Sequence, residues 1–520
     1  MADPHVYFYG INGTRGGYLV DPLSTDTVAA LDAAPDSAPV GVASAPHPAS
    51  PVEEAPAPAP SDGRRWRTFD PNDPRFKPKP RVLRFRGWAK WVNPDDLASA
   101  GWAVIFPHDI EPAIVDALQP LLDLRRRQAS AKEQRFFRCC CGADSYLPGD
   151  TAADFLARRG AGMGLADPKA FPYYVLLVGP PTRIPFHFQY ELDSQYAVGR
   201  VAFDTPEEYA AYAQAVVAAE KRTRAAGPVP VALFSTRHAG DTATDLSARY
   251  LVGGIEQHLG DPRLRCRVER WTGPDATKDA ALRILGGDRK PALLFSATHG
   301  MAFERGDTRQ RAHQGALVCH DDARPPEFGQ RAEHRLAADD IGDSADVSGM
   351  IAFFFGCYTA GTPADGGALR THVPGQAHAS EEFLSRLPQR LLSHPRGGAL
   401  AVVGHVDVAW SRSFLIPPRQ PATVTFCSAL EGMVEGQRVG CALEAFGQHG
   451  GQIAVGIQGD RQRGGSDAAY LLRSFEDARN YVLLGDPAVR LPPPAGGATS
   501  ELTRPREPRF RTFDPALLKR

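Results

Sequence analysis

Short runs of consecutive apolar residues recur through the middle of the chain. A strand that is buried on both faces of a parallel sheet reads as a continuous apolar run and not as an alternation. The pattern predicts strands at 102–106, 173–178, 197–202, 229–234, 292–297, 350–355 and 399–403, and helices at 110–127, 205–224, 242–259, 381–392 and 425–434. Strands that alternate with helices favour an α/β fold with a mostly parallel sheet flanked by helices. We expect two such sheets, one around residues 100–225 and one around 226–490.

The flanks of this pattern are of a different kind. Residues 31–65 are dominated by Ala, Pro, Ser and Asp, and cannot bury enough apolar surface to order themselves. Residues 6–20 combine apolar runs with glycines and predict a hairpin. The predicted parts are a short N-terminal motif (1–30), a disordered Ala/Pro-rich linker (31–65), an N-terminal α/β subdomain (66–225), a second α/β domain (226–490) and a flexible C-terminal tail (491–520). A pentapeptide, Arg-Thr-Phe-Asp-Pro, occurs at 67–71 and again at 511–515, and is read as chance or as a shared docking peptide.

Composition narrows the class of protein. The chain has 520 residues, with 59 Lys and Arg against 60 Asp and Glu, so its formal net charge is -1. That balance removes the bulk electrostatic argument for nucleic acid or a membrane surface as partner. No apolar run reaches the roughly 18 residues of a membrane span, and the start lacks the pattern of a secretory signal. The 8 cysteines have neither disulfide-framework nor zinc-ribbon spacing, so we expect a cytoplasmic protein with reduced thiols.

Two predicted strands end in groups that carry chemistry. The first is followed by His299 and Gly300, and the second by Gly356 and Cys357. If the strands are neighbours, imidazole and thiol emerge side by side as a nucleophilic dyad. Gly300 and Gly356 leave backbone room for a substrate carbonyl, and the N–H groups of Gly300 and Cys357 would form an oxyanion hole. Taken singly, a Cys at a strand end is usually core and a His is usually a satisfied polar group, but the pair together favours catalysis.

This pair of motifs resembles the caspase-like superfamily of cysteine peptidases. Further segments are most similar to its gingipain-type branch: PYYVLLVG at 172–179, IPF at 184–186, LDSQYAVGR at 192–200 and LLGDP at 483–487. The resemblance covers roughly residues 100–490. It implies a caspase-like catalytic domain preceded by a smaller α/β subdomain. It also implies a cysteine endopeptidase with His299 as catalytic imidazole and Cys357 as nucleophile, working through a thioester on protein substrates.

The same resemblance suggests a specificity pocket. The strand after the nucleophile lines the S1 pocket in such enzymes, and here it leads to Asp407, Trp410 and Ser411. Trp410 would stack on the substrate backbone or on a P2–P3 side chain, the alternative being a core Trp. A carboxylate from Asp407 or Asp193 would pair with a basic P1 residue, the alternative being a solvated loop Asp.

The segment between the two motifs, 303–348, is longer than in gingipains. Its first part, 314–320, predicts a β-hairpin over the site, and its second part predicts a helix start capped by Asp339 or Asp340. No cofactor or metal is implied. Less favoured alternatives are a Ca²⁺ site at Asp339, Asp340, Asp343 and Asp346, and zinc ligation by His313, Cys319 and His320. The Arg-rich stretch 305–311 offers self-cleavage sites if P1 is basic.

Other functions stay open. One alternative is a catalytically silent caspase-like scaffold that binds a partner protein or peptide, because a fold alone never proves activity. Another is a Cys-dependent hydrolase of small acyl substrates. The resemblance to caspase-like peptidases of bacterial type suggests a role in stress or antiphage defence, triggered by a regulatory partner. The linker and the motif at 6–20 would serve such regulation.

Overall fold

A computed structural model describes most of the chain. The described residues are 5–14, 16–24, 88–89, 91–162, 164–222, 227–287, 289–320, 331–364, 378–416, 420–462 and 468–493. The predicted linker, nearly all of the C-terminal tail and both copies of the repeated pentapeptide lie outside them. Within these ranges, none of the helices is both long and apolar enough to cross a bilayer.

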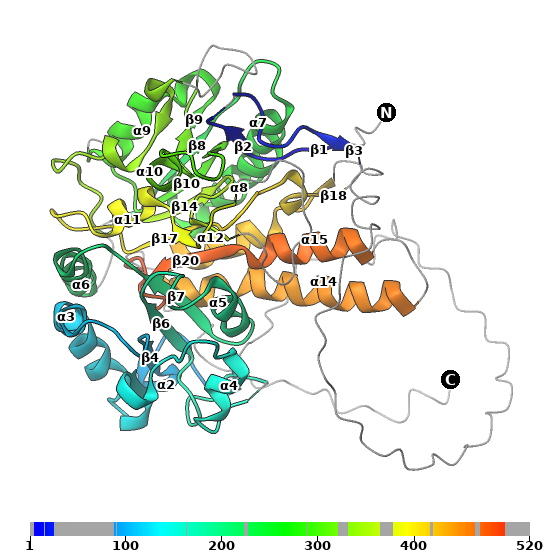
Figure 1. The fold of residues 1–520 in the computed structure, drawn as a ribbon. Coiled ribbons are helices and arrows are strands. Elements are labelled where there is room, and N and C mark those ends of the chain that lie inside the picture. The colour runs from blue at the N-terminus through cyan, green and yellow to red at the C-terminus, as the bar shows by residue number, and fades with distance from the viewer. Residues whose placement is uncertain are drawn as a thin grey trace, which may run out of the picture.

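One ten-stranded sheet forms the centre of the molecule (Figure 1). All seven predicted strands are in it, which confirms the α/β fold with a mostly parallel sheet, but the two expected sheets are joined into one. The order is β5 (Phe137–Cys140), β4 (Trp102–Ile105), β6 (Tyr174–Val178), β7 (Ala197–Val201), β20 (Tyr481–Gly485), β17 (Ala401–His405), β14 (Ile351–Phe355), β10 (Leu293–Ala297), β8 (Val229–Ser235) and β9 (Cys266–Thr272).

The two halves of this sheet run in opposite directions. β20 pairs antiparallel with β17 and parallel with β7, whereas the other pairs of neighbouring strands are parallel. The last strand of the described chain therefore joins the halves. The carboxyl ends of β8, β10, β14 and β17 consequently meet at one edge of the sheet, and those of β4, β6 and β7 at the other.

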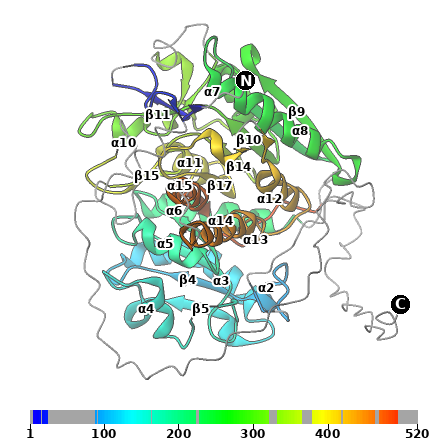
Figure 2. The same ribbon diagram turned by 90° about the vertical axis from the view of Figure 1, so that its right-hand side faces the viewer.

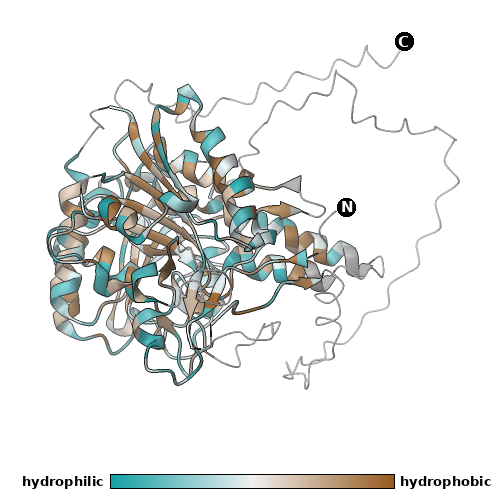
Figure 3. Cartoon of the chain, turned by 90° about the horizontal axis from the view of Figure 1, so that it is seen from above, coloured by the Kyte–Doolittle hydropathy of each residue, from teal (hydrophilic) through white to brown (hydrophobic). Residues whose placement is uncertain are grey.

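Helices cover both faces of the sheet (Figures 1 and 2). The strands that they enclose are mostly hydrophobic (Figure 3). α6 begins where predicted, because Thr205 and Glu208 form a capping box and Pro206 takes the first turn. α3 continues through Pro120, and Pro388 lies in the first turn of α11, where its missing N–H has no partner to lose. The helices of six or more residues are α3 (Pro112–Ala129), α4 (Ala152–Ala157), α5 (Phe186–Asp193), α6 (Pro206–Glu220), a π-helix (Ser247–Val252), α8 (Gly253–Leu259), α9 (Lys278–Leu285), α11 (Arg386–Leu392), α12 (Val424–Val434), α14 (Glu444–Gln462) and α15 (Ala468–Arg479).

A small second sheet lies beside the carboxyl ends of β10 and β14. Its order is β13 (Arg335–Leu336), β12 (Leu317–Val318), β11 (Gly300–Ala302) and β2 (Gly10–Asn12). β12 pairs antiparallel with both β11 and β13, so the predicted hairpin at 314–320 contributes a strand here. β2 comes from the N-terminus, pairs parallel with β11, and lies at the top of the molecule in Figure 1. The predicted hairpin at 6–20 is present in part, since Ile11 bridges Tyr18 and β1 (His5–Val6) pairs with β3 (Leu23–Ser24).

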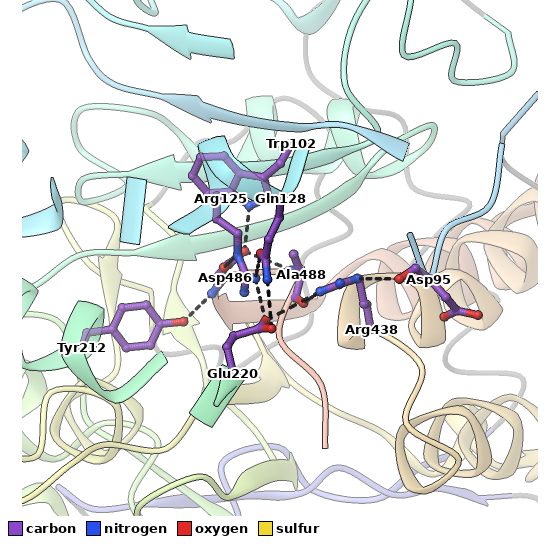
Figure 4. A network of polar contacts seen from close by, with 9 residues as sticks. All are labelled: Asp95, Trp102, Arg125, Gln128, Tyr212, Glu220, Arg438, Asp486 and Ala488. Carbon is purple, nitrogen blue, oxygen red and sulfur yellow. Dashed lines mark hydrogen bonds and ion pairs between the residues drawn. The ribbon is translucent and has the colours of Figure 1, made fainter. Parts of the chain in front are cut away.

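A buried polar network fastens the two halves together (Figure 4). Asp486, directly after β20, accepts hydrogen bonds from Arg125 Nε at 2.7 Å and from Trp102 Nε1 at 2.9 Å. Its backbone N–H donates to the hydroxyl of Tyr212. Arg125 also pairs with Glu220 at 2.6 Å, so strands and helices of the first half hold the turn that follows the last strand. The LLGDP stretch of the sequence is therefore a structural anchor.

The cysteine run at 139–141 lies at the edge of the main sheet. Cys139 and Cys140 belong to β5, an edge strand, and Cys141 follows it. The predicted strands do not include β5, of whose four residues only Cys140 is buried.

Candidate active site

His299 and Cys357 leave the sheet side by side. β10 and β14 are parallel neighbours in the register Ala297 with Phe355, and each candidate lies two residues beyond that pair. Both side chains are fully buried. Gly300 allows this proximity, because a Cβ on it would lie 1.9 Å from the carbonyl oxygen of Cys357. Gly356 has a similar role, since its Cβ would lie 2.8 Å from the carbonyl oxygen of Thr298.

Asp241 completes the group on the imidazole side. It caps α7 (Thr242–Leu246), just beyond β8, and its Oδ2 lies 2.8 Å from Nε2 of His299. Burial would raise the pKa of this carboxyl. The charge of His299 and the hydrogen bonds from His299, Thr244 and Tyr18 outweigh burial and hold the pKa well below its usual range. The carboxylate is therefore ionised and can orient the imidazole, as the third member of a catalytic triad does.

The Cys357 thiol is kept neutral. Burial raises its pKa well above the usual value, although a hydrogen bond from the N–H of Ala409, 3.3 Å from Sγ, acts in the opposite direction. A neutral thiol needs a base before it can attack a carbonyl.

The backbone N–H groups of Gly300 and Cys357 converge on one oxygen. Both donate to the carbonyl oxygen of Tyr9, at 2.9 and 3.0 Å. Two N–H groups at this distance from one carbonyl oxygen, beside a thiol, have the geometry of an oxyanion hole. The sequence suggested these two donors, but it did not suggest that a residue of the N-terminal motif would fill the position.

Trp410 and Ser411 contact the same N-terminal segment. The ring of Trp410 stacks on Phe8 with centroids 6.1 Å apart, and the N–H of Ser411 donates to the carbonyl oxygen of Tyr7 at 2.8 Å. Both were expected to bind substrate, and here they bind a peptide of the chain itself.

The two carboxylates suggested for a basic P1 residue lie apart. Asp407 follows β17 with a positive φ of 115°, a strained conformation for a non-glycine residue, and its Oδ1 lies 3.5 Å from Nε2 of His378. Asp193 ends α5 and is exposed. The strand that follows it, β7, is three strand spacings from β14, about 14 Å. The structure thus brings Asp407 near Cys357, because the carbonyl oxygen of Asp407 accepts the N–H of Tyr358 at 2.8 Å, and it leaves Asp193 at a distance.

No group of three or more His, Cys, Asp or Glu side chains among the described residues is arranged to hold a metal ion. The four carboxylates considered as Ca²⁺ ligands do not share a site. Asp340 pairs with Lys278, Asp343 with Arg390 and Asp346 with Lys290, while Asp339 is exposed. The predicted helix start here is a single 3₁₀ turn, Ala338–Asp340.

The residues weighed for zinc are likewise not arranged as ligands. Burial raises the pKa of Cys319 to about 12, so this thiol is neutral in the metal-free protein. His320 stacks on His238, and His313 lies against Phe303.

Comparisons with known proteins find similarity only at the level of structure. No protein-family model matches the chain, and no curated protein matches it. The Arg-specific cysteine proteinase gingipain R is 11% identical, with 78% of this chain and 80% of that chain covered and a TM-score of 0.46. The complex of the pro- and mature domains of RgpB from Porphyromonas gingivalis is 11% identical, with 75% and 79% covered and a TM-score of 0.44. The separase–securin complex of Saccharomyces cerevisiae is 12% identical, with 60% of this chain and 15% of that chain covered and a TM-score of 0.32.

Proposed function

We propose that this protein is a cysteine endopeptidase in which Cys357 is the nucleophile, His299 the general acid and base, and Asp241 the residue that orients His299. Gly300 and Cys357 supply the oxyanion hole, and Ala409, Trp410 and Ser411 bind the peptide.

One observation carries the proposal. A peptide carbonyl is held by two backbone N–H groups beside a cysteine, at the carboxyl end of a strand next to the one that presents a histidine. A core cysteine at a strand end does not need two converging N–H donors. In acyl transfer such donors stabilise the developing oxyanion, and removing one donor typically slows the reaction by about 10²–10³-fold.

The reaction follows from these positions. The sulfur of Cys357 adds to the carbonyl carbon of the P1 residue while the thiol proton passes to His299. The C–N bond breaks, the leaving amine takes that proton, and a thioester remains on Cys357. Water then adds to the thioester, which releases the carboxylic acid and restores the thiol.

The test is hydrolysis of fluorogenic peptides that differ only at P1 (Tyr, Arg, Lys, Asp or Leu) by the wild type, Cys357→Ala and Cys319→Ala. Cys319 is a matched control, because it is a second buried thiol at the end of a strand in the small sheet. We expect Cys357→Ala to abolish hydrolysis and Cys319→Ala to retain it. Equal hydrolysis by the wild type and Cys357→Ala would overturn the proposal. The panel also tests the basic P1 preference suggested by Asp193 and Asp407.

A second candidate is a silent scaffold that binds a peptide or a partner protein. The neutral, fully buried thiol of Cys357 favours it. The scaffold predicts that no P1 panel is hydrolysed and that a peptide electrophile does not label Cys357. Hydrolysis of small esters without hydrolysis of peptides would instead favour the small-acyl hydrolase. A role in bacterial defence, a regulatory partner and a cytoplasmic location remain predictions from the sequence.

A further inference from the structure

The N-terminal segment lies beside Cys357 as a strand that pairs with residues 409–411. The N–H of Tyr9 donates to the carbonyl oxygen of Ala409 at 2.9 Å, and the N–H of Ser411 donates to the carbonyl oxygen of Tyr7 at 2.8 Å. Phe8 and Trp410 form the antiparallel bridge between these two bonds. This is the strand addition by which peptide-binding proteins hold an extended ligand, with backbone bonds for affinity and alternate side chains for specificity.

The bonding fixes the direction and register of the segment. Because the carbonyl oxygen of Tyr9 occupies the paired N–H groups of Gly300 and Cys357, the peptide bond beside the thiol is the one between Tyr9 and Gly10. In the numbering of a peptidase groove, Tyr9 stands at P1, Phe8 at P2, Tyr7 at P3 and Gly10 at P1′.

Tyr9 fills a pocket that matches its shape and its hydroxyl. The side chain is completely buried. Its ring meets Phe355 edge-on at 4.6 Å and lies 5.8 Å from the ring of His299, while its hydroxyl donates to the carbonyl oxygen of Ala243 at 2.7 Å. The hydroxyl adds a hydrogen bond to these ring contacts, although the carbonyl oxygen of Ala243 also accepts the N–H of Ser247 and so keeps one partner without it.

The next position leaves little room beside the thiol. A Cβ on Gly10 would lie 3.1 Å from Sγ of Cys357 and 3.0 Å from a methyl carbon of Leu19. Beyond Gly10, β2 continues along β11, with Ile11 opposite Met301 and Asn12 opposite Ala302. The segment therefore runs along residues 409–411 on one side of the thiol and along β11 on the other.

From these contacts we infer that residues 7–10 occupy the substrate groove as an internal peptide. The groove accordingly takes peptide segments with tyrosine before, and glycine after, the bond that faces Cys357. The inference rests on the proposed function in one respect, that the bond facing Cys357 is the bond to be cleaved. Occupancy of the groove and preference among peptides can be measured without turnover. While the segment is seated, the thiol is covered, and an external peptide has to compete with the segment for the groove.

The first experiment measures how fast iodoacetamide alkylates Cys357 in the full chain, by mass spectrometry of the peptide that contains it. Gly10→Val places branched carbons against Sγ and displaces the segment, and Tyr9→Ala empties the pocket as a second, milder variant. His5→Ala is the control, because His5 is exposed on the same segment outside the groove. We expect alkylation at least tenfold faster in Gly10→Val and Tyr9→Ala than in the wild type and His5→Ala. Equal rates in all four proteins would overturn the inference.

The second experiment tests the peptide preference in trans. A synthetic octapeptide with the sequence of residues 5–12 is added to Gly10→Val, next to a version with Arg at the position of Tyr9. We expect the tyrosine peptide to slow alkylation at least tenfold at concentrations where the arginine peptide has no effect. Equal protection by both peptides, or by neither, would overturn the tyrosine preference.

Turnover separates this inference from the proposed function. If the protein is a peptidase, Gly10→Val hydrolyses a Val-Tyr-Phe-Tyr fluorogenic peptide faster than the wild type does. Protection by the octapeptide without hydrolysis of any peptide would refute the peptidase and leave the occupied groove established. Hydrolysis with P1 Arg preferred over P1 Tyr would refute the inference and leave the peptidase intact.

Discussion

The carboxylate of Asp241 receives several groups at once. Oδ2 meets Nε2 of His299 and accepts a hydrogen bond from Thr244 at 2.6 Å, and Oδ1 accepts one from Tyr18 at 2.8 Å. So many partners in a buried place fix both the carboxylate and the imidazole. Tyr18 belongs to the N-terminal segment, so displacement of that segment removes one of these bonds, while the N–H of Ala243 still donates to Oδ1 at 3.1 Å.

Asp241→Asn should lower kcat by about 10²-fold in the Gly10→Val background with KM little changed, because general acid–base catalysis is worth roughly 10²–10⁴-fold and depends on imidazole orientation. Steady-state kinetics checks both parameters.

Asp245→Asn is the control for this variant. Asp245 lies on the same helix but is paired with Arg237 at the surface. A similar loss in both variants, or a rise in KM with kcat unchanged in Asp241→Asn, would contradict the orienting role of Asp241.

At the scale of elements, the strands that could be predicted are the ones covered on both faces. β10 and β14 are continuous apolar runs with every residue buried, and their terminal His-Gly and Gly-Cys pairs revealed half of the candidate site. β9 reads Cys-Arg-Val-Glu-Arg-Trp-Thr, with partly exposed residues throughout, because it is an edge strand. Its pattern carries charge where a buried strand carries none, so periodicity missed it.

The rest of the site depends on contacts that are distant in sequence. Asp241 reaches His299 across 58 positions, and Tyr9 reaches Ala243 across 234. An Asp before a helix is usually a cap, and a Tyr beside a glycine is usually part of a turn. Neither pattern therefore indicates the distant residue that the side chain contacts. For Asp241 a signal was available, because it follows a strand whose carboxyl end lies at the same edge as those of β10 and β14.

The turn after β20 supplies a prediction of stability. Asp486→Asn leaves the buried guanidinium of Arg125 without one of its two carboxylates, and we expect a loss of about 3 kcal/mol in the free energy of unfolding. Urea unfolding followed by circular dichroism measures it. Asp343→Asn is the control, because its pair with Arg390 is exposed, with 82% of the Asp343 side chain accessible, and should change stability by less than about 1 kcal/mol. Equal losses in the free energy of unfolding would show that the buried network in Figure 4 stabilises the fold no more than an exposed ion pair does.

At the scale of the whole molecule, the reversal of strand direction between the two halves of the sheet could not be predicted from the sequence. Apolar runs show which residues form strands, but they carry no information on order or direction. The reversal depends on a single late strand, β20, inserted between β7 and β17. The stability of the assembled sheet consequently depends on charges that meet at this junction.

Acid should weaken this junction. Burial would raise the pKa of Glu220, but the charges of Arg125 and Arg438 and hydrogen bonds from Arg125 and Gln128 lower it from 4.5 to about 2. A carboxylate with a lowered pKa stabilises the folded state above its ordinary pKa, and that contribution is lost as the pH falls from about 4.5 to about 2. Its size is about 3 kcal/mol.

Glu220→Gln should therefore be about 3 kcal/mol less stable than the wild type at pH 7, and the difference should shrink as the pH approaches 2. Urea midpoints at pH 7, 5 and 3 measure it. Glu207→Gln, an exposed change on the same helix, should stay within about 0.5 kcal/mol of the wild type at each pH. A difference for Glu220→Gln that is constant with pH would refute this origin.

The peptide in the groove is covalently part of the protein that it covers. An intramolecular ligand is present at a fixed effective concentration, set by the tether and independent of how dilute the protein is. Dilution therefore cannot uncover Cys357, whereas it would release a separate inhibitor. A substrate supplied from outside competes against that constant concentration, so its apparent affinity is weakened by the same factor for every peptide, and relative preferences among peptides survive.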